Sequence, residues 1–461
     1  MAGGHKEKPG VHFDPNNISS SVLKSTSFKI IFCKGIELGL QIWHIDVITA
    51  FLNSKAKHVI FMTLPIQLAD FGVPRLVKLL KGLYGTHDAS RLWWDLLHHV
   101  LVVKLKFIQS TSDPCLYYHS IKIIILGVYV DDCPFVASRS DYEWLCTNLE
   151  LDFKITTKGP MTQGLGIDVH QTIENGMLTS VTLSQESFIT ELLTQYGFLL
   201  SKPVYTPAIP NTFLVPDMSD YETHNDCKES TLSLKNFSSL VGSLLWLNLQ
   251  TRPDISQATT QLTRSVSNPC PSHITAAKHL LRYLNGTRNL GITYSKSGNS
   301  TPQIYSDATW ASDPHTQRSV NAYVVLLYGA AISWHCGTQK SVSLSTTESE
   351  YFALSETVKE AVYIKHALLQ LNFASIKHWQ KEPMVIFEDN QAVIKIIVGD
   401  IKHKHQKHIL VRLAYVREQF QSNTIIPVYV PSADNIADVL TKNLPRDTFT
   451  RFQRLLLGIL N

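Results

Sequence analysis

An almost unbroken apolar run, residues 121–130, ends in two adjacent aspartates, Asp131 and Asp132. A second apolar run, residues 133–137, follows at once. Two strand-like runs joined at this point predict a β-hairpin with both carboxylates at its tip. Because Asp is also a common turn residue, the pair alone fits a simple turn as well as a site for a divalent metal ion.

A third acid, Asp46, has a matching setting. It follows the loosely alternating apolar stretch 41–45, which predicts a strand that delivers Asp46 at its exposed end. Strands that end in acids can converge on a two-metal site, which clamps a phosphoryl group during in-line displacement. Phe51 follows closely and is a candidate to lie beside the sugar of an incoming nucleotide, with a core phenylalanine as an equal alternative.

A series of short motifs extends this observation along the chain. They are Asp46-Val47-x-x-Ala50-Phe51-Leu52-Asn53, Lys81-Gly82-Leu83-Tyr84-Gly85, Asp113-Pro114-Cys115-Leu116-Tyr117, Tyr129-Val130-Asp131-Asp132, Leu165-Gly166-Ile167, Val241-Gly242-Ser243-Leu244, Thr251-Arg252-Pro253-Asp254-Ile255 and Leu281-Arg282-Tyr283-Leu284-x-Gly286-Thr287. In these motifs, and in their order, the chain resembles the reverse transcriptase and ribonuclease H (RNase H) part of the Pol polyprotein of copia-type LTR retrotransposons. The resemblance covers nearly the whole chain.

Four further acids follow toward the C-terminus, at a strand end, a helix start, a second strand end and a second helix start. Each alone fits a surface position or a helix cap. The ordered set resembles the RNase H fold, in which four carboxylates hold two metal ions that hydrolyse the RNA strand of an RNA–DNA hybrid. Glu350 is preferred to Glu348 because the family's acid is followed by x-x-Ala, which Ala353 matches. The four acids carried over are Asp307, Glu350, Asp389 and Asp438.

The resemblance also implies roles for the first set of acids. Asp46, Asp131 and Asp132 are expected to be the catalytic metal ligands of the polymerase, as the four later acids are for RNase H. The expected cofactor is Mg²⁺, two ions per site, with Mn²⁺ as an alternative. Phe51 and Arg91 are expected to contact the nucleotide. The expected partners are an RNA/DNA hybrid, a template–primer nucleic acid and a dNTP.

The alternation of strand-like and helical runs predicts an α+β and α/β multidomain protein. Lys278 and Arg282, on a predicted helix, fit either a solvated face or a track for phosphates. The predicted parts are a disordered N-terminus (1–20), a partial reverse-transcriptase palm with its fingers largely missing (21–200), a linker (201–236), a helical thumb or connection (237–300), an RNase H-like domain (301–445) and a C-terminal tail (446–461).

Bulk composition sets weak limits. A net charge of +4 is compatible with nucleic acid but does not require it. Seven scattered cysteines without a Cys-x-x-Cys pair predict reduced thiols in an intracellular protein, which the resemblance would place in a cytoplasmic virus-like particle or in the nucleus. No signal peptide and no long apolar run are evident, so a membrane span is not expected.

The chain departs from the family's pattern at places that bear on polymerisation. No arginine precedes Arg75, although the family begins with basic fingers that grip the triphosphate. Asp88 stands where the family usually has Gln, and an acid there would repel phosphate. We therefore expect a polymerase-impaired fragment that retains RNase H activity. The alternative is a non-catalytic remnant, either pseudogene-type or domesticated as a nucleic-acid-binding protein.

Overall fold

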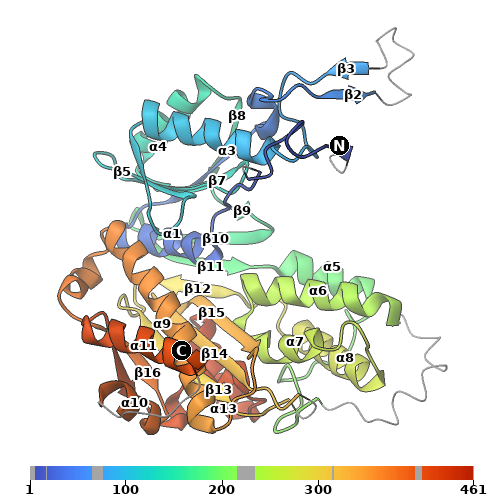
Figure 1. Cartoon of the computed structure of the whole chain (residues 1–461), viewed down its shortest axis with the longest axis vertical. Helices are drawn as coiled ribbons and strands as arrows, with labels where there is room; N and C mark the ends of the chain where they lie inside the picture. The colour runs from blue at the N-terminus through green and yellow to red at the C-terminus, as the bar shows by residue number, and fades with distance from the viewer. Residues whose placement is uncertain are drawn as a thin grey trace. The chain divides into compact units, whose positions relative to one another are not determined.

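The computed structural model describes residues 6–16, 18–64, 76–214, 234–313, 316–399 and 407–459. The chain divides into two compact units, Met1–Leu165 and Gly166–Asn461. Both units contain sheets and helices (Figure 1), which confirms the predicted mixed α/β multidomain class.

The first unit is built on six strands in the order β4-β5-β6-β7-β1-β8. The predicted hairpin consists of β6 (Ile124–Gly127) and β7 (Asp132–Ala137), and β1 (Ile42–Val47) pairs antiparallel with the other edge of β7. The other elements are α1 (Ser25–Leu38), η2 (Ala50–Asn53), β2 (Phe61–Thr63), β3 (Leu76–Lys78), α3 (Ala89–His99), η3 (Val100–Lys104), β4 (Phe107–Gln109), β5 (Leu116–His119), α4 (Arg139–Glu150), β8 (Ile155–Pro160) and β9 (Gln163–Gly164).

Helix α1 covers β6 and β7 and buries an apolar stripe that includes Phe28, Ile31 and Phe32. It ends at Gly39, whose φ of 66° is the left-handed conformation that favours glycine at a helix C-terminus. The hairpin turn is closed by paired backbone hydrogen bonds between Tyr129 and Asp132, of 2.8 and 3.0 Å. The helix thus packs on the strands that carry the turn with the two aspartates.

The N-terminal segment differs from the predicted disorder over residues 6–16. Phe13 is buried, and its ring stacks on His87 with 4.3 Å between the ring centroids. The carboxylate of Glu7 accepts a hydrogen bond from the His87 backbone N–H at 2.9 Å. One apolar and one acidic side chain therefore attach this segment to the loop before α3, an interaction that its polar composition did not predict.

The second unit begins earlier than the predicted boundary at residue 200. Its first strands, β10 (Ile167–Glu174) and β11 (Met177–Ser184), form a hairpin, and β11 pairs antiparallel with β12 (Ile292–Ser295). Because this pairing joins the hairpin to sequence more than a hundred residues later, the hairpin belongs to the second unit. Helix α5 (Glu186–Gln195) follows within the range predicted as palm. The predicted helical region then forms α6 (Leu234–Gln250), η5 (Pro253–Ile255), α7 (Ser256–Thr263) and α8 (Pro271–Gly286).

The predicted C-terminal tail and part of the predicted linker pack against the second unit in the structure. The segment predicted as a C-terminal tail forms α13 (Arg446–Leu457), which buries Phe449, Phe452 and Leu456 in the core of the second unit. Within the predicted linker, residues 201–214 are described, and Asn211 donates its backbone N–H to the Asn443 carbonyl at 2.8 Å. Residues 215–233 of that linker lie outside the described part of the chain.

A five-stranded sheet in the order β15-β14-β13-β16-β17 forms the C-terminal half of the second unit. Strands β13, β14 and β15 are antiparallel neighbours, whereas β16 and β17 run parallel to β13. This order, with the long helix α9 packed on β13 and β14, is that of the RNase H fold implied by the resemblance (Figure 1). The elements are β13 (Gln303–Thr309), β14 (Val320–Leu327), β15 (Ala330–Thr338), α9 (Thr346–Gln370), η6 (Ala374–Gln380), β16 (Met384–Glu388), α10 (Gln391–Val398), α11 (Lys407–Gln421), β17 (Ile425–Tyr429), η7 (Ser432–Asp434) and α12 (Asp438–Thr441).

A buried ion pair gives a physical reason for the Thr251–Ile255 motif. The Arg252 guanidinium donates two hydrogen bonds to the Asp254 carboxylate, at 2.9 and 2.8 Å, and both side chains are fully buried. The Tyr283 hydroxyl also donates to Asp254, and Gln453 of α13 donates to Tyr283. Burial opposes ionisation, but the Arg252 charge lowers the pKa of Asp254 below its ordinary value. The network therefore joins η5, α8 and α13.

Across the part of the chain that the structure describes, no helix has both the length and the apolar character needed to cross a bilayer.

Replacing Asp254 with Asn should destabilise the second unit by about 3–5 kcal/mol, because the Arg252 charge would remain buried without its partner. Urea unfolding followed by circular dichroism measures this loss. The matched control is Glu143→Gln at the exposed Arg139–Glu143 pair (2.7 Å), which should cost less than about 1 kcal/mol. Equal losses in the two variants would contradict a stabilising role for the buried network.

Candidate metal centre

Three acids from separate elements of the second unit meet at one point. Asp307 lies within β13, Glu350 in the first turns of α9 and Asp389 directly after β16, and one ligand oxygen from each lies within 4.8 Å of the other two. The parallel pairing of β13 and β16 brings Asp307 and Asp389 together, and α9 lies across β13. The sequence predicted Asp307 at the strand's end, whereas β13 continues to Thr309.

The preference for Glu350 over its neighbour Glu348 agrees with the geometry. Glu348 is half-buried, and its carboxylate accepts the Leu344 backbone N–H at 2.8 Å, so it helps to cap the start of α9. Glu350 is buried and faces the other acids. The two acids thus have different surroundings although they are only two residues apart.

The surroundings of these acids fit a cation. Burial, followed by the charge of Asp307, raises the pKa of Glu350 well above its ordinary value, and burial raises that of Asp307. The Glu350 Oε2 atom is buried and has no hydrogen-bond partner among the described residues. An orphaned buried oxygen next to two like charges is unfavourable in the protein alone. A divalent ion, which prefers carboxylate oxygens, would remove both penalties.

The fourth predicted acid, Asp438, is linked to Asp307 by an ion pair of each carboxylate with Lys442. The Lys442 Nζ atom lies 2.6 Å from Asp438 Oδ1 and 3.4 Å from Asp307 Oδ1. The Thr441 hydroxyl donates to the other oxygen of Asp307. Burial, followed by the charge of Asp307, raises the pKa of Asp438 to about 7. Sequence reasoning missed Lys442, although an Asp and a Lys four residues apart at a helix start is a pairing signal.

A fifth acid, Glu388, was also missed. It is fully buried, and its Oε1 accepts the Asn390 backbone N–H at 3.1 Å, while its Oε2 has no partner among the described residues. Burial raises its pKa well above the ordinary value. Strand alternation places Glu388 on the inward face of β16 with Met384 and Ile386, a signal that the sequence did contain.

In the first unit, Asp46 of β1 lies directly opposite Asp132 of β7. Asp131 lies in the adjoining turn, where burial and then the charges of Asp132 and Asp46 raise its pKa. The buried His44 places Nε2 2.8 Å from Asp132 Oδ1, and this hydrogen bond lowers the pKa of Asp132. The three acids predicted to serve a polymerase are thus neighbours, but among the described residues they do not form a compact group like Asp307, Glu350 and Asp389.

The two predicted nucleotide contacts have protein partners. Phe51 is half-buried and packs on Tyr84 with 4.4 Å between ring centroids. Burial and then the charges of Asp131 and Asp46 raise the pKa of Tyr84, so this ring lies near these two acids. Arg91 pairs with Asp95 at 2.9 Å. The roles of Phe51 and Arg91 at a nucleotide therefore stay predictions.

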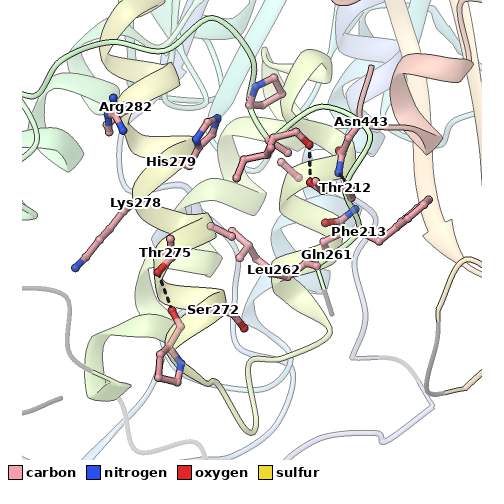
Figure 2. Close-up of a pocket in the computed structure, with 17 residues that line it drawn as sticks. Thr212, Phe213, Gln261, Leu262, Ser272, Thr275, Lys278, His279, Arg282 and Asn443 are labelled. Atoms are coloured by element: carbon pink, nitrogen blue, oxygen red, sulfur yellow. Dashed lines mark hydrogen bonds between the residues drawn. The ribbon is translucent and has the colours of Figure 1, made fainter. Parts of the chain in front are cut away.

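A cavity of about 750 Å³ in the second unit contains none of the predicted acids (Figure 2). It lies between α7, α8 and residues 207–214, with Lys278 and Arg282 of α8 among its lining side chains. Figure 2 shows Lys278 projecting away from the other side chains, and the Arg282 Nε donates to the Lys202 carbonyl at 2.8 Å. The phosphate track at these two residues remains a prediction.

Comparison with known proteins finds a family model and several relatives that match this chain. Residues 1–210 match the family model described as reverse transcriptase (RNA-dependent DNA polymerase). The transposon Ty5-1 protein of Saccharomyces cerevisiae is 30% identical over 330 residues, which cover 99% of that protein and 68% of this chain. The chain belongs to the copia-type retrotransposon Pol family.

Longer members of the copia-type family place the chain within Pol. The Pol polyprotein of transposon TNT 1-94 from Nicotiana tabacum is 33% identical over 453 residues, or 97% of this chain and 33% of that protein. The chain thus spans about a third of the length of this relative, and it corresponds to the reverse transcriptase and RNase H region of a retrotransposon Pol polyprotein. A foamy viral protease-reverse transcriptase solved in complex with an RNA/DNA hybrid is 12% identical, with a TM-score of 0.48, covering 88% of this chain and 45% of that one.

Replacing Glu350 with Gln should weaken Mn²⁺ binding by the second unit at least about tenfold, because even the loss of a residue that only orients a metal ligand typically costs 10–100-fold. Isothermal titration calorimetry of the full chain measures the change. Glu348→Gln is the matched control and should bind as the unchanged chain does. Equal weakening of Mn²⁺ binding by both substitutions would contradict the assignment of Glu350 as a metal ligand.

Proposed function

We propose that the second unit of this chain cleaves the RNA strand of an RNA/DNA hybrid with the help of Mg²⁺ or Mn²⁺. The observation that carries the proposal is the convergence of Asp307, Glu350 and Asp389, with one oxygen from each within 4.8 Å of the others. The order and directions of the five strands around them support it. An intracellular location, in a virus-like particle or in the nucleus, belongs to the same proposal.

The chain's own residues would hold and orient the ions. Asp307, Glu350 and Asp389 would supply the ligand oxygens of one ion, and Asp438 would join Asp307 in facing a second. The Ser432 hydroxyl donates to Asp389 Oδ2 at 2.7 Å, which fixes the orientation of that carboxylate. When bound, the ions would supply charge stabilisation for an in-line displacement at phosphorus.

Replacing Asp389 with Asn should reduce cleavage of an RNA/DNA hybrid by about 100-fold or more, because several kcal/mol of charge stabilisation would be lost. The measurement is the rate of RNA-strand cleavage in a labelled hybrid with Mg²⁺ present. Glu348→Gln is the control and should keep the rate of the unchanged chain. Asp389→Asn cleaving at the unchanged rate would contradict the assignment.

The alternative function is that of a non-catalytic remnant that only binds nucleic acid. Salt-sensitive binding of the hybrid without any RNA cleavage by the unchanged chain would favour this alternative. The same labelled hybrid therefore separates the two functions, since binding and cleavage are measured on one substrate.

We further propose that the first unit is impaired as an RNA- and DNA-templated DNA polymerase, although Asp46, Asp131 and Asp132 would be its metal ligands. Two observations support this. The His44 imidazole contacts one oxygen of Asp132 and would compete with a metal ion for it. Asp88, buried near the start of α3, adds a carboxyl group where the family usually has an amide.

Purified full chain should therefore extend a DNA primer on a poly-RNA template at least about 100-fold more slowly than an active reverse transcriptase, since losing one preorganised group typically costs 10²–10³ in rate. Incorporation of labelled dNTP measures the extension. Exchanging Asp88 for Gln together with His44 for Gln should raise the rate. Robust extension by the unchanged chain would overturn this part of the proposal.

A further inference from the structure

The position between Asp307 and Asp438 is occupied by a side chain of the protein itself. The Lys442 ammonium lies 2.6 Å from Asp438 Oδ1 and 3.4 Å from Asp307 Oδ1. The second oxygen of Asp307 accepts the Thr441 hydroxyl. The positive charge of Lys442, the residue directly after α12, therefore links Asp438 to Asp307.

A lysine ammonium is charged at neutral pH. Here two carboxylates face it, with Nζ–Oδ1 distances of 2.6 Å to Asp438 and 3.4 Å to Asp307. Asp307 also belongs to the group with Glu350 and Asp389, so its carboxylate faces two cation positions. One of these includes the orphaned Glu350 Oε2 atom, and the other holds the lysine.

We propose that Lys442 is a built-in cation that takes the place of a second divalent ion in the resting site. One divalent ion binds readily at Asp307, Glu350 and Asp389. A second ion binds between Asp307 and Asp438 only after Lys442 moves away. This inference rests on the proposed function, because it specifies which of the same acids bind each of the two cations.

The charges and the exposure of the lysine support this order of binding. An ammonium and a divalent ion within a few ångströms of each other repel, because both are positively charged and little water separates them. The Lys442 side chain is 36% exposed, whereas that of Asp307 is 1% exposed. The lysine can therefore move toward water, while Asp307 stays fixed between the two positions.

The test counts Mn²⁺ ions bound by the full chain, using the EPR signal of free Mn²⁺. Both arms carry Asp46→Asn and Asp132→Asn, so that the first unit contributes no ions. With Lys442 present, one ion should bind per chain, and a second should bind at least about tenfold more weakly. Lys442→Met should strengthen the second ion at least about tenfold, whereas Lys442→Arg, which keeps the charge, should behave like the unchanged residue.

The outcomes separate the inference from the function on which it rests. If Lys442→Met leaves the number and affinity of bound ions unchanged, the inference is wrong while hybrid cleavage can still hold. If the chain with Lys442 binds no Mn²⁺ in the second unit, the proposed function itself fails.

Thermal unfolding provides a second readout that does not depend on counting ions. Lys442→Met should unfold at a lower temperature than the Lys442 chain in EDTA, because Asp307 and Asp438 lose their counter-charge. Added Mn²⁺ should raise its melting temperature more than that of the Lys442 chain, since binding to the folded state stabilises it. If Mn²⁺ raises the melting temperature of Lys442→Met no more than that of the Lys442 chain, the inference is wrong. Lys442→Gln repeats the test with a polar side chain.

Discussion

Mutual repulsion among buried carboxylates is the constraint on which the RNase H-like unit depends. Asp307, Glu350 and Asp389 face one another closely, and the fully buried Glu388 directly precedes Asp389. Burial raises the pKa values of Asp307, Glu350 and Glu388, and neighbouring carboxylate charges raise them further. Each of these three charges is therefore unfavourable unless a cation or a proton compensates it. The fold must therefore supply enough stability to hold the acids together. The site in turn is prepared for a positive charge before any substrate arrives.

The scaffold meets this requirement with elements that are far apart in the sequence. Parallel pairing of β13 with β16 fixes two acids, and α9 brings a third across the sheet. The helical part of the same unit is joined by the buried Arg252–Asp254 pair, with Tyr283 and α13 completing the network. Removing one partner of such a pair costs far more than removing an exposed one, because the remaining charge stays buried. Within this unit, the Arg252–Asp254 ion pair thus serves stability, whereas the carboxylates of Asp307, Glu350 and Asp389 form the site.

Much of this arrangement could be predicted from the sequence, because the main signals are local. The apolar runs around Asp131 predicted the β6–β7 hairpin. The resemblance to the copia-type family, rather than the spacing of elements alone, singled out Asp307, Glu350, Asp389 and Asp438, and the first three of these acids meet in the structure. What was missed depends on contacts between distant residues. Lys442 joins Asp438 to Asp307 across more than a hundred residues, His44 meets Asp132 only because β1 pairs with β7, and the β10–β11 hairpin belongs to the second unit through β12. The N-terminal segment and α13 are rich in polar residues, so their composition did not predict that Phe13 stacks on His87 or that α13 packs into the core.

The proposed function requires that the acids of the second unit bind a divalent ion. Crystals of the full chain soaked in Mn²⁺ and measured at the manganese absorption edge test it most directly, because the anomalous signal locates the ion without reference to activity. The predicted result is a strong peak bounded by the carboxylates of Asp307, Glu350 and Asp389. Fully occupied manganese elsewhere in the second unit, with none among these three side chains, would contradict the claim.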